Sequence, residues 1–158
     1  MSTYDWLLMI HVSGAFLLVG GGAAAAVLNV RARYAESPGE IATLLQLIAK
    51  VAVPAIGIGS VTTLVIGIWL VHHAGFSYGT FWVWAAIILW VVASALGGRG
   101  GRYQARAGQE AARLAKEGGQ ITPELRAMVR DPIGNALSYS SGVVLVLILV
   151  LMIFKPGQ

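Results

Sequence analysis

The sequence contains no cysteine and little charge. Without cysteine the chain has no disulfide, no thiolate metal site, no iron–sulfur cluster and no cysteine nucleophile. It also lacks H-E-x-x-H and G-x-S-x-G motifs and a phosphate-binding glycine loop, which argues against hydrolase and nucleotide-binding functions. Charged residues make up 11% of the 158 residues and hydrophobic residues 57%. This composition predicts an integral membrane protein.

Four apolar segments are long enough to cross a hydrocarbon layer of roughly 30 Å. They span about residues 4–30, 51–74, 81–98 and 132–154. Lipid offers no partners to backbone N–H and C=O groups, so each span is expected to be a helix. Short connections predict one all-α domain, an integral membrane four-helix bundle. The first segment lacks the basic start of a signal peptide and is expected to stay as a membrane helix.

The basic residues gather in two loops. Arg31, Arg33 and Lys50 flank the first loop, seven others lie in the loop 99–131, and only Lys155 lies elsewhere. This positive-inside pattern predicts that both loops are cytoplasmic, which gives an N-out/C-out topology. It accounts for the net charge of +4 without nucleic acid as a partner. The expected partner is the lipid bilayer.

The loops carry helical patterns of their own. Four apolar residues at helical spacing, with Arg106–Glu110 and Arg113–Glu117 four apart, predict a short amphipathic helix along the inner leaflet. The four apolar residues are Tyr103, Ala107, Ala111 and Leu114. Glycines in "GGRGGR" (97–102) are expected to end the third span. The stretch "SPGEIATLLQLIAK" predicts an interfacial helix, with a kink or a new start at Pro54.

His11 lies inside the first span, roughly 10 Å below its outer end. An ionisable group at that depth is costly and indicates a function, although a structural hydrogen bond to a neighbouring helix is the alternative. Small residues at helical spacing from His11 predict that it faces other helices. On that basis Gly21→Leu or Gly22→Leu should harm assembly more than Ala26→Leu.

The other two histidines, His72 and His73, end the second span on the same side of the membrane as His11. His73 shares its helix face with Gly59, Thr62, Thr63 and Trp69, so it is the better candidate to face inward. Imidazoles from two facing helices are the axial ligands of a b-type haem. The residues therefore predict haem b held by His11 and by His73 or His72, for electron transfer or haem-linked redox chemistry.

Aromatic residues and one cation lie at the same end. Lys155 would meet the haem propionates, and the aromatic residues would pack on the macrocycle. The aromatic residues are Trp6, Trp69, Phe76, Tyr78, Trp82 and Trp84. Interfacial anchoring explains the same aromatic residues and Lys155 equally well, and His72 and His73 also fit solvated positions at a loop edge.

Two alternatives stay open. Met9 and Met152 offer thioether sulfur near the three histidines, which favours a copper-binding or copper-transport protein, although Met9 and His11 diverge around their helix. The small-residue faces also fit a structural subunit of a larger membrane complex or a homo-oligomer.

The stretches "YDWLLMIHVSGAFLLVGG", "GIWLVHHAGFSYG" and "LMIFKPG" are similar to a bacterial family of four-helix membrane proteins. That family resembles the copper-resistance-protein-D-like superfamily, whose relatives include the membrane-bound protoporphyrinogen oxidase. The resemblance implies a multi-pass protein of the bacterial inner membrane, with His11 as a ligand to haem b or a metal. The third span lacks the lysine of the oxidase relatives, and Leu18 stands where copper-handling relatives tend to have tryptophan.

Overall fold

The computed structural model describes residues 2–77 and 79–156 and is helical almost throughout. The helices are α1 (Thr3–Arg33), α2 (Pro38–Leu47), the π-helical turn η1 (Ile48–Ala52), α3 (Val53–His73), α4 (Phe81–Lys116), α5 (Pro123–Val129) and α6 (Pro132–Phe154). Four helical segments of the described chain are long and apolar enough to span a membrane. The expected all-α membrane fold with four spans is confirmed.

Side-chain oxygens set the starts of several helices. Thr122 accepts a hydrogen bond from the backbone N–H of Leu125 at 3.1 Å, and Asp131 accepts one from Gly134 at 2.6 Å. In each case proline takes the first helical position, where its missing N–H costs nothing. The sequences "TPEL" and "DP" therefore place α5 and α6.

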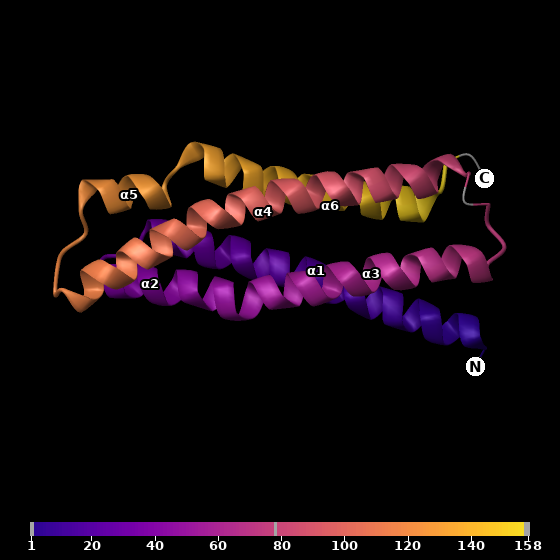
Figure 1. Cartoon of the computed structure of the whole chain (residues 1–158), viewed down its shortest axis with the longest axis horizontal. Coiled ribbons are helices and arrows are strands. Elements are labelled where there is room, and N and C mark those ends of the chain that lie inside the picture. The colour runs from indigo at the N-terminus through magenta and orange to yellow at the C-terminus, as the bar shows by residue number, and fades with distance from the viewer. Residues whose placement is uncertain (1, 78, 157–158) are drawn as a thin grey trace.

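The helices form two long pairs that are joined at one end (Figure 1). Along the spans α1 packs on α3 and α4 packs on α6, whereas α3 makes hardly any contact with α4 or α6 among the described residues. At the end where α1 stops at Arg33, which we call the basic end, α2 packs on α4 and on α1 and ties the pairs together. At the opposite end, which we call the histidine end, α1 begins and α3 finishes at His73.

The largest apolar core lies at the basic end. It brings together buried side chains of α1, α2, η1, α4 and α5, among them Ile41 and Leu125, which are fully buried. Within the spans most apolar side chains are exposed on the outside of the bundle, as lipid requires. The two pairs are therefore held together mainly outside their membrane-crossing parts.

Helix α4 continues through the glycines that were expected to end it, so that prediction was wrong. The reason is close packing on α6: a Cβ at Gly100 would collide with the Ser138 hydroxyl and lie 3.1 Å from the carbonyl oxygen of Gly134. Glycine lowers helix propensity by about 1 kcal/mol, yet it lets the two backbones approach. Gly97 and Gly100 are contact positions on α6 rather than a helix end.

The amphipathic segment that was expected on the inner leaflet is the last part of α4, and its apolar stripe packs on protein instead. Ala107, Ala111 and Leu114 are buried in the core against α2. Of the two ion pairs expected there, Arg113–Glu117 is present at 3.0 Å, whereas Glu110 pairs with Arg113 at 2.6 Å instead of with Arg106. The Arg113 hydrogen bond keeps the pKa of Glu110 below its ordinary value.

Pro54 kinks a helical run rather than starting a separate helix. It has no N–H to donate within the helix, and the turn before it widens into the π-helical η1. The preceding α2 was expected at the membrane interface, but it buries Ile41 and Leu45 against other helices. The run α2–η1–α3 thus contacts both helix pairs, because α2 packs on α4 while α3 packs on α1.

Three glycines allow α1 and α3 to touch. A Cβ at Gly59 would lie 2.5 Å from the backbone nitrogen of Leu18, and one at Gly14 would lie 2.9 Å from the Thr63 hydroxyl. A Cβ at Gly21 would lie 3.1 Å from the carbonyl oxygen of Ala52. The predicted small-residue interface of the first span is confirmed at Gly14 and Gly21.

Gly22 does not belong to this interface, so the prediction that paired it with Gly21 was wrong. Among residues 2–77 and 79–156, no heavy atom of another helix lies within 4 Å of where a Cβ at Gly22 would be. We expect Gly21→Leu to destabilise the protein by about 2 kcal/mol, because the side chain would force α1 away from η1 and α3. Gly22→Leu and Ala26→Leu should change stability little. Thermal unfolding in detergent measures all three, and equal losses for Gly21→Leu and Gly22→Leu would contradict the interface.

The cysteine-free chain allows a direct test of topology. Because the basic residues gather at one end, we expect that end to face the cytoplasm. A cysteine introduced at the exposed Gln109 should resist a membrane-impermeant maleimide in intact cells, and one at the exposed Ser77 should react. Labelling of both after cell lysis is the control, and the reverse pattern in intact cells would overturn the predicted orientation.

Candidate functional site

An apolar groove of about 670 Å³ separates the two helix pairs in the histidine-end half of the molecule. All four spans line it, and almost all of its surface is apolar. Its volume lies within the roughly 300–1,000 Å³ typical of small-molecule and cofactor sites. The groove exists because the pairs are joined at the basic end and do not pack closely in the membrane half.

Polar contacts between helices mark the inner limit of the groove. Trp90 of α4, which lines the groove, donates its indole N–H to the Ser60 hydroxyl of α3 at 2.8 Å. Further toward the basic end, the side-chain amide of Asn29 donates to Asn135 at 3.0 Å and links α1 to α6. These bonds join one helix pair to the other and define where the groove stops.

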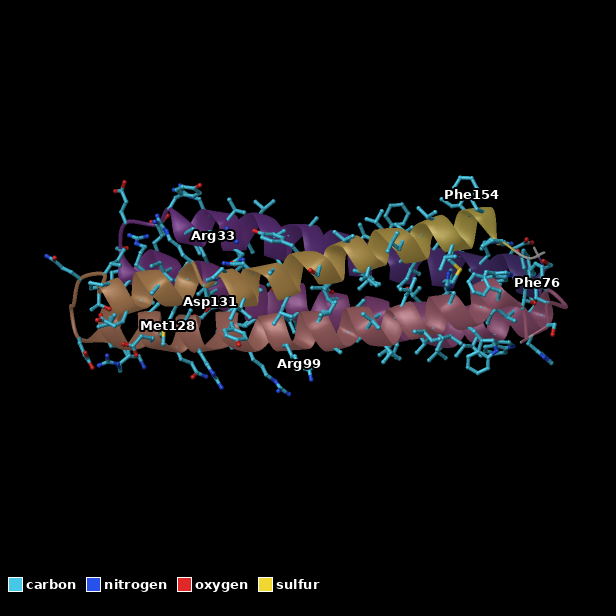
Figure 2. All side chains as sticks on the ribbon, turned by 90° about the horizontal axis from the view of Figure 1, so that it is seen from above. Arg33, Phe76, Arg99, Met128, Asp131 and Phe154 are labelled. Carbon is cyan, nitrogen blue, oxygen red and sulfur yellow. The ribbon has the colours of Figure 1, made fainter. Side chains whose placement is uncertain are left out.

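An aromatic cluster closes the histidine end. Trp82 is buried and packs edge-to-face on Phe76 with ring centroids 5.6 Å apart. The Lys155 ammonium lies 4.9 Å from the Phe76 ring centroid and 5.8 Å from that of Trp82, both cation–π distances. Met152 of α6 and Val71 of α3 complete this cluster. A cation and a thioether therefore lie at the end of the groove, and Figure 2 shows Phe76 and Phe154 there.

His11 lies in the wall of the groove, against α3. Its ring touches Gly67 so closely that a Cβ there would lie 2.9 Å from Cε1 and 3.2 Å from Nδ1. The Nδ1 atom is buried and has no hydrogen-bond partner among the described residues. The Thr63 backbone faces the ring, but the contact falls outside ordinary hydrogen-bond geometry. His11 is thus half-buried in an apolar wall with a polar atom unpaired.

Two further groove residues carry unpaired polar atoms. The hydroxyl of Thr63 and the indole nitrogen of Trp82 are buried and have no hydrogen-bond partner within the described chain. Buried polar atoms are almost always paired, and each unpaired one costs about 1–3 kcal/mol. Three residues that line one groove, His11 among them, therefore each have a buried polar atom without a partner among the described residues.

The structure does not bring His73 or His72 into the groove. Both are exposed at the end of α3, and neither lines the groove. His73 lies six residues beyond Gly67, which is about 9 Å further along the helix than the level of His11. Among the described residues that line the groove, His11 is therefore the only histidine.

The other predicted site residues divide into two groups. Lys155 and Met152 line the groove with His11, whereas Met9 and Trp69 are 46% and 52% exposed on the outside of the bundle. Of the expected aromatic residues, Phe76, Trp82 and Trp84 line the groove, Trp6 is exposed outside it, and Tyr78 lies outside the described residues. Among residues 2–77 and 79–156, no three His, Asp or Glu side chains cluster in a way that would hold a bare metal ion.

Sequence reasoning missed Gly67 and Trp90 and gave Thr63 no role of its own. Gly59, Thr63 and Gly67 recur every four residues on α3, which is the signal that marks the face toward α1. That spacing could have placed Gly67 opposite His11. The position of Trp90 depends on how the two pairs meet, and no pattern within one helix reveals it.

The fold and groove define a class: an integral membrane protein of four spanning helices with a cavity between two helix pairs. The chain belongs to the DUF2269 family of predicted integral membrane proteins, whose profile matches residues 5–156. No match was found among curated proteins or among solved structures. The family match confirms a multi-pass membrane protein, while the likeness to the copper-resistance-protein-D-like superfamily rests on the residues quoted above.

Proposed function

We propose that this protein binds haem b in the groove, with His11 as an axial ligand, and serves electron transfer or haem-linked redox chemistry. The observation that carries the proposal is the half-buried His11 imidazole, with Nδ1 unpaired, in the wall of a large apolar groove. A porphyrin has the size and apolar surface for such a groove. Bound haem would supply the one-electron chemistry that no side chain of this chain provides.

The environment of His11 supports a ligand role. A metal-binding histidine commonly donates its second ring N–H to a backbone carbonyl, which fixes the tautomer. The backbone of Thr63 lies beside the His11 ring. Donation from Nδ1 to that carbonyl would leave the lone pair on Nε2 for the iron. Gly67 provides the space for the ring at this position.

The rest of the groove fits the polar groups of haem. Lys155 places an ammonium at the histidine end, where carboxylates would find a counter-charge. The thioether of Met152 is a second donor that haem iron accepts. The proposal does not rely on His73, the partner expected from the sequence, because it lies outside the groove.

Absorption spectroscopy with metal analysis tests the proposal. The full-length chain is expressed with a haem precursor, purified in mild detergent, and a second sample is titrated with haemin. We expect a Soret band, a shift on reduction and saturation near one haem per chain. Protein that shows no Soret band after both treatments overturns the haem proposal. Copper in such a sample would instead favour the copper-binding alternative.

A further inference from the structure

Three arginines meet where α1 ends. The guanidinium of Arg126 donates to the carbonyl oxygens of Arg33 at 3.1 Å and of Ala35 at 3.0 Å. The guanidinium of Arg130 donates to the same Arg33 carbonyl at 3.3 Å. These bonds pair carbonyls that a helix C-terminus leaves free, and positive charge suits that end of the helix dipole. The fold thus concentrates guanidinium groups at one edge of the basic end.

No carboxylate neutralises these charges within the described residues. The ion pairs of the basic end involve Arg31 with Glu40, and Arg113 with two glutamates, but not Arg33, Arg126 or Arg130. Asp131 follows Arg130 directly, yet its carboxylate caps the N-terminus of α6. Figure 2 shows Arg33 and Asp131 at this end, where α1 stops and α6 begins. The arginine cluster keeps a net positive charge.

The Arg33 side chain points along α6 toward the membrane. Its Nη2 donates to the Tyr139 hydroxyl at 2.6 Å, and its guanidinium carbon lies 5.5 Å from the Tyr139 ring centroid. Its Nε is buried without a hydrogen-bond partner in the described chain. Tyr139 is seven residues into α6, about 10 Å along the helix, and is 42% exposed. Tyrosine at such a depth is typical of the membrane–water interface.

An apolar stripe continues from this point along the same face of α6. Val143, Val146 and Val150 follow Tyr139 at helical spacing, and all three are exposed. A ligand that has a phosphate beside the arginines and acyl chains over the valines would match both parts of this surface. A free phosphate would use only the first part.

We propose that Arg33, Arg130 and Tyr139 bind the phosphate of an anionic phospholipid at the basic end. Guanidinium groups bind phosphate through paired, charge-assisted hydrogen bonds. The half-buried Arg33 guanidinium, which is held beside the exposed Tyr139, and the exposed Arg130 supply the donors. The site lies where the arginines meet the outer face of α6, at the end of the molecule opposite the groove, so it is independent of the proposed haem function.

Lipid retention by the purified full-length chain tests this site. The chain is equilibrated in detergent with equal amounts of phosphatidylglycerol and phosphatidylcholine, gel-filtered, and the bound lipids are quantified by mass spectrometry. We expect the wild-type protein to retain phosphatidylglycerol preferentially. Arg33→Gln and Arg130→Gln should each lower that preference roughly fivefold, which is the contribution of one basic residue near an anionic surface.

The controls separate a specific site from general attraction. Arg99→Gln removes the same charge from an exposed position on α4, where Figure 2 shows the side chain directed away from the bundle, and it should leave the preference unchanged. Among the described residues the Arg130 side chain makes one hydrogen bond, to the Arg33 carbonyl, so Arg130→Gln should fold and can be measured even if Arg33→Gln does not fold. Equal loss in Arg99→Gln, or no loss in Arg130→Gln, overturns the site. Displacement of the lipid by millimolar inorganic phosphate would assign the arginines to a free anion and overturn the lipid proposal.

Discussion

Gly59→Val is expected to lower the free energy of unfolding by about 3 kcal/mol. A Cβ at this position would lie 2.5 Å from the backbone nitrogen of Leu18 and 2.6 Å from the carbonyl oxygen of Gly14. Both are backbone atoms of α1, so no side-chain rotation relieves the collision and the helices must separate. Thermal unfolding in detergent, followed by circular dichroism, measures the effect, and gel filtration reports loss of the monodisperse protein.

Gly57→Val is the matched control for this substitution. It makes the same change two residues earlier on α3, where no described part of another helix lies within 4 Å of the added Cβ. Effects of valine on helix propensity are the same in both variants and cancel in the comparison. If the two variants unfold at the same temperature, the close contact between α1 and α3 at Gly59 is refuted.

His11→Ala is expected to lower haem content at least roughly tenfold, because it removes the axial ligand of the proposed site. His72→Ala and His73→Ala should leave the absorption spectrum and haem content close to wild type, since both side chains lie outside the groove. The three variants are purified in parallel and titrated with haemin. A His11→Ala protein with the wild-type spectrum would exclude His11 as a ligand. Loss of haem in His73→Ala instead would restore the ligand pair expected from the sequence.

Gly67→Ala tests whether the position of the His11 ring matters for haem binding, because the variant keeps the histidine but displaces its ring. The added methyl would lie 2.9 Å from Cε1 of His11 and 3.2 Å from Nδ1, so the ring must shift while the ligand atoms remain. We expect weaker haem binding and a displaced Soret band, with helical content unchanged. Gly57→Ala, which meets no neighbour, should retain the wild-type spectrum. If the Gly67→Ala spectrum is unchanged, the His11 imidazole is not a ligand to the haem iron at this position.

At the basic end, the sequence pattern of one segment did not predict which part of the protein that segment contacts. Ala107, Ala111 and Leu114 have the spacing of an amphipathic helix, and the helix is present, but this apolar stripe covers α2 rather than lipid. The same stripe suits either environment, because hydrophobic burial is non-directional. Gly100 likewise signals a helix end or a close contact, and only the position of α6 decides between them. Local patterns specify that a surface is apolar, while the fold specifies what covers it.

The sequence by itself determined the membrane class, the four spans and the helix starts. Long apolar runs must be helical in lipid, and the capping oxygens of Thr122 and Asp131 act within one turn, so these features need no distant partner. His11 also stood out alone, because an imidazole among apolar residues is costly wherever its helix packs.

Only the tertiary structure decided which residues share the groove with His11. It paired α1 with α3 and α4 with α6, left a space between the pairs, and placed Lys155 and Met152 beside that space but His73 outside it. The difference of about 9 Å between the levels of His11 and His73 follows from the register at which Gly14 and Gly59 let their helices touch. Register between helices depends on contacts of residues far apart in the chain, and spacing within one helix does not contain it.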